Sequence, residues 1–222
     1  MRKHIFARIE FPWKSRIELW KKTFSDPSNS PARYTRSLSI RKSPVVTSVD
    51  TGVGGWTRTF SGIVRLYLDI RGFNGGRKVS LIPLHGLSPT LKSLCLVYGH
   101  SASSSETFSF VCSFPLLEDL ALVSRGGNEI DGWNIPSTSP KLTGCLDLMM
   151  LSGTRPAVHR LLELPSGLRF SKIVVLCPNK DLELMTDLIS KCSDILEFLR
   201  VGVCRRSTGV FFLHQLLWLV NT

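Results

Sequence analysis

The chain has 222 residues, of which 43% are hydrophobic, and its formal net charge is +11. This length and apolar content allow a substantial buried core. The apolar run near Met1 is too short for a secretory signal peptide, and the run at 210–220 is too short to span a bilayer, so the sequence argues against a secreted or membrane-spanning protein.

An apolar pair separated by one residue recurs along the chain at intervals of 26 to 29 residues. The copies are Ile9/Phe11, Leu38/Ile40, Leu66/Leu68, Leu94/Leu96, Leu120/Leu122, Leu146/Leu148, Ile173/Val175 and Leu199/Val201. Leucine-rich repeats have periods of about 20–29 residues. The pattern therefore predicts an α/β fold: a leucine-rich-repeat solenoid of about eight strand–helix repeats with a parallel sheet, as one domain over 1–222.

We expect these repeats to be irregular. The usual motif has Asn or Cys three residues after the second member of each pair, and here only Cys204 fits that position. In addition, 142–146 holds one residue more than the other copies, which makes Gly144 a candidate bulge.

The segments between strands carry helical patterns. Capping-box patterns at Ser15–Glu18 and Ser103–Glu106 precede apolar residues at helical spacing. Residues 154–164 and 181–192 each carry one apolar stripe, which predicts two more helices. We expect turn glycines at 52–55, an irregular crossover at 124–140, and a terminal cap helix within 210–222.

The period of two in a strand separates core residues from outward ones. One strand cannot bury its leucines alone, but stacked copies bury them together. The outward positions then form the predicted partner-binding, concave face, with Arg41, Arg65, Tyr67, Asp69, Val97, Val123, Met149 and Leu176. The alternative for its apolar part is a cover formed by loops or by the apolar tail.

The sequence shows no pattern typical of an enzyme. The glycines at 52, 54 and 55 lack the spacing of a phosphate loop, and the five histidines are scattered without a metal-binding motif. We therefore expect no catalysis, no cofactor and no metal.

Six cysteines lie at positions 95, 112, 145, 177, 192 and 204, with no CxxC pair. We interpret them as reduced and mostly buried thiols. This usage is typical of an intracellular protein of the cytoplasm or nucleus.

Several phrases, loops included, resemble the leucine-rich region of fungal F-box-like proteins over roughly residues 5–203. They are PARYTRSLSI at 31–40, SPTLKSL at 88–94, FPLLEDLAL at 114–122, DGWNIPSTSPKLTG at 131–144 and LRFSKI at 168–173. The resemblance implies repeats that hold the substrate of a ubiquitin ligase. No F-box helices precede the first repeat, so docking on the ligase adaptor is expected only if an F-box is supplied elsewhere.

Two other functions remain open from the residues alone. Residues 1–50 hold eleven Lys or Arg against four acidic residues, which favours a basic nucleic-acid-binding solenoid as the alternative to a protein-binding module. A gene fragment without selected activity is the third reading.

Overall fold

The computed structural model describes residues 6–41, 53–70, 81, 84, 87, 89–98, 104–124, 139–150, 154–207 and 210–219. All structural statements below concern these residues.

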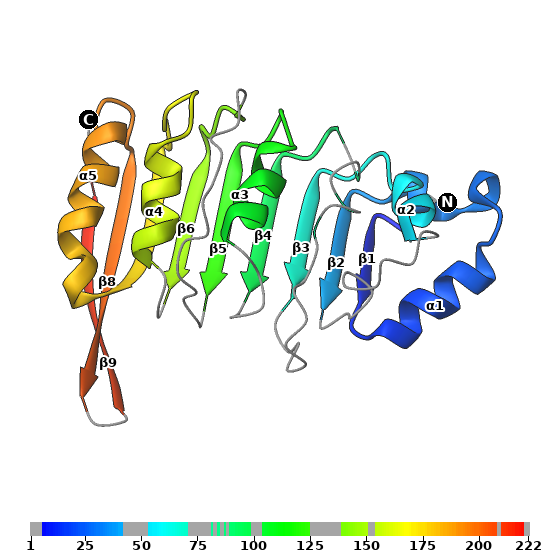
Figure 1. Ribbon diagram of the computed structural model, residues 1–222, viewed down its shortest axis with the longest axis horizontal. Coiled ribbons are helices and arrows are strands. Elements are labelled where there is room, and N and C mark those ends of the chain that lie inside the picture. The colour runs from blue at the N-terminus through cyan, green and yellow to red at the C-terminus, as the bar shows by residue number, and fades with distance from the viewer. Residues whose placement is uncertain are drawn as a thin grey trace.

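The fold is built on one open sheet whose strands follow one another in chain order (Figure 1). The strands are β1 (Arg8–Phe11), β2 (Ser37–Arg41), β3 (Arg65–Asp69), β4 (Ser93–Tyr98), β5 (Asp119–Ser124), β6 (Cys145–Met150), β7 (Lys172–Pro178), β8 (Phe198–Ser207) and β9 (Val210–Leu219). Strands β1 to β8 pair in parallel, and β9 pairs antiparallel with β8. An α/β fold with eight parallel strands in sequential order is compatible with a solenoid.

The strand register confirms the repeat read from the sequence. The first members of the apolar pairs align across the sheet, from Ile9 through Leu94 to Leu199, and the second members align from Phe11 through Leu96 to Val201. All sixteen side chains of these two rows are buried. Each buried leucine contributes about 1.5–3 kcal/mol to stability, so the two rows make up a large part of the core.

A repeated backbone contact joins successive strands at their beginnings. The carbonyl just before a strand accepts hydrogen bonds from two successive amides of the next repeat, at 2.8 to 3.2 Å. Such carbonyls belong to Ala7, Arg36, Val64, Lys92, Gly144 and Ser171. A carbonyl oxygen has two lone pairs and can accept both bonds. This contact fixes where each new strand begins relative to the previous one.

The extra residue before β6 alters this contact. The Glu118 carbonyl accepts only the Gly144 amide, at 3.1 Å, and the Cys145 amide donates instead to Oδ1 of Asp119 at 2.8 Å. Thr143 has the spacing of the buried residues that precede most of the other apolar pairs, but it is exposed, and its neighbour Leu142 is buried instead. The predicted irregularity at Gly144 is therefore real, and the Asp119 side chain completes the backbone pairing there.

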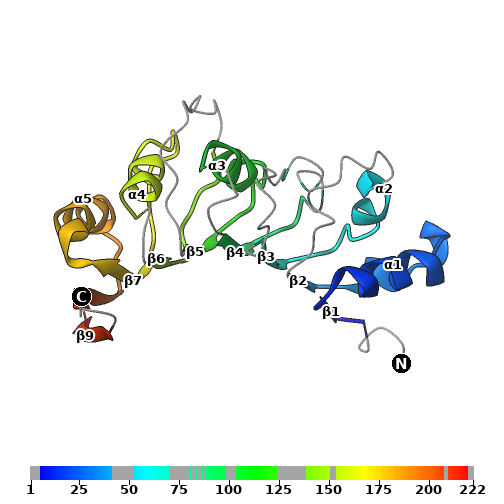
Figure 2. The ribbon, with the colours of Figure 1, turned by 60° about the horizontal axis from the view of Figure 1, so that its bottom comes forward.

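The helices lie on one side of the sheet, and the strands line the inner side of a shallow arc (Figure 2). The α-helices are α1 (Lys14–Thr23), α2 (Val53–Arg58), α3 (Ser104–Cys112), α4 (Thr154–Leu162) and α5 (Leu182–Cys192). Short 3-10 turns occur at η2 (Pro27–Asn29), η3 (Pro31–Tyr34) and η6 (Asn179–Asp181). The four helices predicted from the sequence are all present.

Three sequence-based expectations were wrong. The tail forms strand β9 and not a terminal helix, because β8 offers a free edge where all ten residues of β9 pair with all ten of β8. The segment expected to be a glycine turn holds the short helix α2. Helix α1 begins at Lys14 and not after a Ser15 cap; its N-cap is Trp13, which makes no side-chain capping bond. Most of the expected crossover at 124–140 lies outside the described residues.

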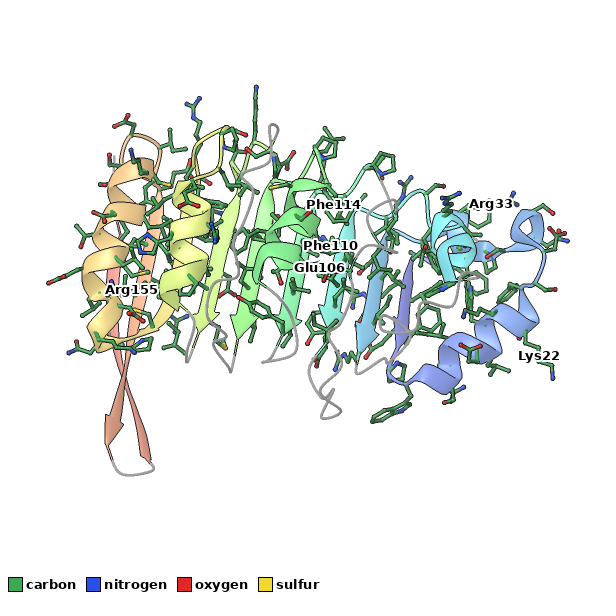
Figure 3. All side chains as sticks on the ribbon, in the orientation of Figure 1. Lys22, Arg33, Glu106, Phe110, Phe114 and Arg155 are labelled. Carbon is green, nitrogen blue, oxygen red and sulfur yellow. The ribbon has the colours of Figure 1, made fainter. Side chains whose placement is uncertain are left out.

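Aromatic side chains fill the space between the sheet and the helices. At the start of the sheet, the ring of Trp20 lies 5.6 Å from that of Phe11 and 5.9 Å from that of Phe60. Farther along, the rings of Phe110 in α3 and of Phe114 just after it meet edge to face with their centroids 4.9 Å apart, and both side chains are buried (Figure 3). The apolar rows and the aromatic side chains of the core therefore lie on the helix side, and most of the other side of the sheet is available for a different role.

Leu66→Glu and Arg65→Glu form a matched pair that tests the two faces of the sheet. Leu66 is 2% exposed, so its replacement buries a carboxylate and is expected to cost about 4 kcal/mol or more. The neighbouring Arg65 is exposed, so its replacement should change stability by about 0.5 kcal/mol or less. Urea denaturation measures both; equal losses would contradict the assignment of the faces.

Gly144→Ala tests the contact before β6. An added Cβ would lie 2.1 Å from Asp119 Oδ1, so we expect a loss of about 1–3 kcal/mol from steric crowding. In an Asp119→Ala background this oxygen is absent, and the same substitution should cost at least about 1 kcal/mol less. Thermal or urea denaturation of the wild type, the two single variants and the double variant gives the coupling energy between positions 119 and 144. Additive effects of the two substitutions would argue against the contact.

Candidate functional site

The candidate site is the inner face of the sheet, defined as the side of β1–β8 that faces away from the helices (Figure 2). Residues that alternate with the core leucines lie on it. The register arranges them in three rows. The first begins at Arg8 and runs through Arg65, the second begins at Glu10 and runs through Tyr67, and the third begins at Arg41.

Six of the eight side chains predicted for a binding face are accessible. Arg41 and Arg65 are exposed, and Met149 is 45% exposed. The other three, Tyr67, Val123 and Leu176, are half-buried. These six are available to a partner.

Asp69 and Val97 are buried, each at 3% exposure, so their prediction as accessible residues was wrong. Consecutive residues of a strand point to opposite faces, and three in succession are buried at 68–70 and again at 96–98. Both faces of the sheet are therefore covered at the ends of β3 and β4. Asp69 also makes a polar or electrostatic contact that its burial requires.

A cluster of charged and aromatic groups occupies the inner face over β1–β3. The Arg41 Nε atom lies 2.9 Å from Glu10 Oε1, and the Arg41 guanidinium lies 5.4 Å from the centroid of the Tyr67 ring. Between Glu10 and Tyr67 in the second row stands Ser39, whose covered Oγ has no hydrogen-bond partner in the described part of the chain. The ion pair and the ring contact hold Arg41 in place.

An apolar ladder continues the third row across four neighbouring strands. Val97 pairs with Val123, Val123 with Met149, and Met149 with Leu176. A Cβ placed on Gly202 would lie 2.8 Å from Leu176 Cδ1, so the glycine on β8 makes room for this leucine. We define the apolar ladder as Val123, Met149 and Leu176, its three accessible members.

Carboxylates and thiols also lie on the inner face, where burial raises their pKa values. Burial, with a smaller contribution from Asp147 and then Asp69, raises the pKa of Cys95 to about 11. Burial likewise raises the pKa of Asp147 above its ordinary value. A thiol with so high a pKa is almost wholly protonated at neutral pH and is a poor nucleophile.

Within the described ranges, no group of three or more His, Cys, Asp or Glu side chains is placed to hold a metal ion. The five cysteines whose side chains are described are all free thiols. The described helices include none that combines the length and apolar character needed to cross a membrane. Comparisons with protein-family models, curated proteins and solved structures gave no match.

The sequence pattern placed the face but missed some of its contacts. Glu10 was recognisable as an outward residue, yet its ion pair with Arg41 depends on how two side chains bend toward each other. The role of Gly202 in accommodating Leu176 depends on the register of β7 and β8. No signal in the sequence indicated either contact.

Asp147→Asn tests the electrostatics of the inner face. Because burial raises the carboxyl pKa in the folded state, the folded protein resists ionisation of Asp147, and stability falls as pH rises from the unfolded pKa of about 3.9 through the folded pKa. The amide cannot ionise, so the variant should be more stable than the parent at pH 7, with a smaller difference at pH 4. Urea denaturation at both pH values measures this; a destabilised variant at pH 7 would contradict it.

Proposed function

We propose that this chain is a non-catalytic protein-binding module of the leucine-rich-repeat type, and that its inner face holds the partner. The single observation that carries this proposal is the inner face itself, which presents exposed arginines and Tyr67 over β1–β3 and the apolar ladder over β5–β7, and which no described helix covers. The fungal F-box-like resemblance supports the same role, since it implies substrate-recognition repeats. A ubiquitin-ligase adaptor would join only through an F-box supplied elsewhere.

The residue types on this face suit a protein partner. Arginine, tyrosine and methionine are enriched in protein interfaces, and aromatic and arginine side chains supply much of the binding energy. A surface built for a nucleic-acid backbone would need basic groups along its length. Here basic groups stand at both ends, with arginines over β1–β3 and Lys172 and Arg200 over β7–β8. Between them the accessible third row is apolar from Val123 to Leu176, and Glu10 and Asp147 place carboxylates on the same face.

Capture of partners by paired variants tests the proposal. Tagged wild-type protein is expressed in the source cells, and the captured proteins are compared with those of Arg65→Ala/Tyr67→Ala and Met149→Ser/Leu176→Ser. We expect a stable partner of the wild type to be reduced at least about tenfold by either pair, because each removes anchoring side chains that are worth 1.4 kcal/mol or more together.

Arg16→Ala/Lys22→Ala on the outer surface of α1 is the matched control. Both side chains are exposed, and Lys22 projects from α1 away from the sheet (Figure 3). This control should capture the same partner as wild type. Loss of capture in the control, with both inner-face variants unaffected, would place the binding surface on the helices and contradict the proposal.

A further inference from the structure

We propose that the partner presents one segment that crosses the strands, with acidic residues over β1–β3 and apolar residues over β5–β7. This inference rests on the proposed function and specifies the chemistry of the partner. It follows from the exposed arginines over β1–β3 and the apolar ladder over β5–β7. Two further basic side chains of the inner face, Lys172 on β7 and Arg200 on β8, lie outside the row of the ladder.

The acidic end of the segment is inferred from two free arginines. Arg8 and Arg65 are both exposed and stand in the same row, with Ser37 between them. Two strand spacings separate them, which is about 10 Å. Neither forms an ion pair with a described carboxylate, whereas Arg41 is already paired with Glu10. Arg8 and Arg65 are therefore the two exposed arginines of the inner face over β1–β3 that have no carboxylate partner among the described residues.

A carboxylate is the group that fits these two arginines. The guanidinium is planar and offers paired donors that match the two oxygens of a carboxylate. Tyr67 stands two residues after Arg65 on the same strand and already packs against the Arg41 guanidinium, which limits the movement of both side chains. An acidic residue bound here would lie beside an ordered aromatic ring and not in open solvent.

The apolar end of the segment is inferred from the ladder. Met149 is 45% exposed, and Val123 and Leu176 flank it on the adjacent strands. Exposed apolar side chains that stand in register on neighbouring strands form a continuous patch, and such patches mark contact sites. The Leu176 side chain occupies the space that a side chain on Gly202 of the adjacent strand would take, so its position in the patch is set by packing against β8.

The strand spacing and the register together set the distance between the two ends. Arg65 on β3 and Met149 on β6 are three strand spacings apart, or about 14 Å, across the sheet. Met149 stands in the row of Asp69, four residues farther along the strand direction than Arg65, which adds about 13 Å along the strands and gives a separation of about 19 Å. An extended peptide covers this distance with about six residues, and a helix covers it with about thirteen. The partner segment should therefore carry its acidic and apolar residues at one of these two separations.

Apolar and acidic side chains on the inner face argue against a polyanion as the occupant. A nucleic acid laid along the rows would pass from Arg8 and Arg65 over the apolar ladder and close to the carboxylate of Asp147 before it reached Lys172 and Arg200. Repulsion and lost hydration there would weaken binding. A protein segment can change from acidic to apolar along its length and so matches both ends.

Selection from a random 16-residue peptide library displayed on phage tests the inference. The full chain is immobilised as wild type, as Arg8→Glu/Arg65→Glu, and as Arg16→Glu/Lys22→Glu, which changes the charge equally on α1. The enriched peptides are sequenced, and the best are measured in solution against each protein and against Met149→Ser/Leu176→Ser. Thermal melts establish that each variant is folded, and Arg8→Gln/Arg65→Gln replaces the charge-reversed protein if that protein does not fold.

We expect wild type and the α1 variant to enrich peptides that combine Asp or Glu with Leu, Ile, Phe or Met at one of the two separations. The charge-reversed protein should lose this acidic preference and enrich Lys or Arg instead. Peptides selected on wild type should bind the charge-reversed protein at least about tenfold more weakly, since like charges at an interface cost several kcal/mol. The same peptides should also bind Met149→Ser/Leu176→Ser more weakly than they bind the wild type.

Other outcomes would overturn the inference in distinguishable ways. Peptides that depend on Met149 and Leu176 but show no acidic preference would reject the acidic end and leave the proposed function standing. No enrichment over an unrelated protein, together with no captured partner in cells, would reject the proposed function as well. Salt-dependent binding of a labelled 16-nucleotide RNA by wild type and its loss on charge reversal would assign Arg8 and Arg65 to nucleic acid.

Discussion

The structure depends on the fact that no strand of this chain can bury its own leucines. Each strand places two apolar side chains on the helix side, and these become buried only between the same positions of neighbouring strands. The carbonyl just before β1–β4, β6 and β7 accepts two amides of the next repeat and so sets the start of the next strand, and at β5 the Asp119 side chain completes this contact. This stacking uses one face of the sheet completely and leaves the inner face to carry other chemistry.

Much of the fold could be predicted because the same apolar pair, separated by one residue, recurs at intervals of 26 to 29 residues. Those pairs gave the register of all eight parallel strands, and the apolar stripes gave four of the helices. The tail could not be predicted, because residues 210–219 fit a helix by spacing and a strand by residue type, and the free edge of β8 decides between them. The position of Asp119 near Gly144 likewise depends on a contact between repeats.

The candidate site could be predicted only in part. Alternation along each strand correctly placed Arg65, Tyr67 and Met149 at the surface of the inner face. The same rule failed for Asp69 and Val97, because both faces of the sheet are covered there. Alternation tells which way a side chain points, but not whether other parts of the molecule cover it. The ion pair of Arg41 with Glu10 shows the same limit for charge.

The helix side of the sheet is closed, whereas the inner face is open except at the ends of β3 and β4. Met149 on β6 and Met185 in α5 provide one side chain of the same type on each side, 45% and 1% exposed. Brief oxidation of the folded protein with hydroxyl radicals, followed by tandem mass spectrometry, measures their relative rates. Met149 should be oxidised much faster than Met185, and both should react alike after unfolding in urea. Equal protection of the two methionines in the folded protein would show that the inner face is covered and would contradict this account.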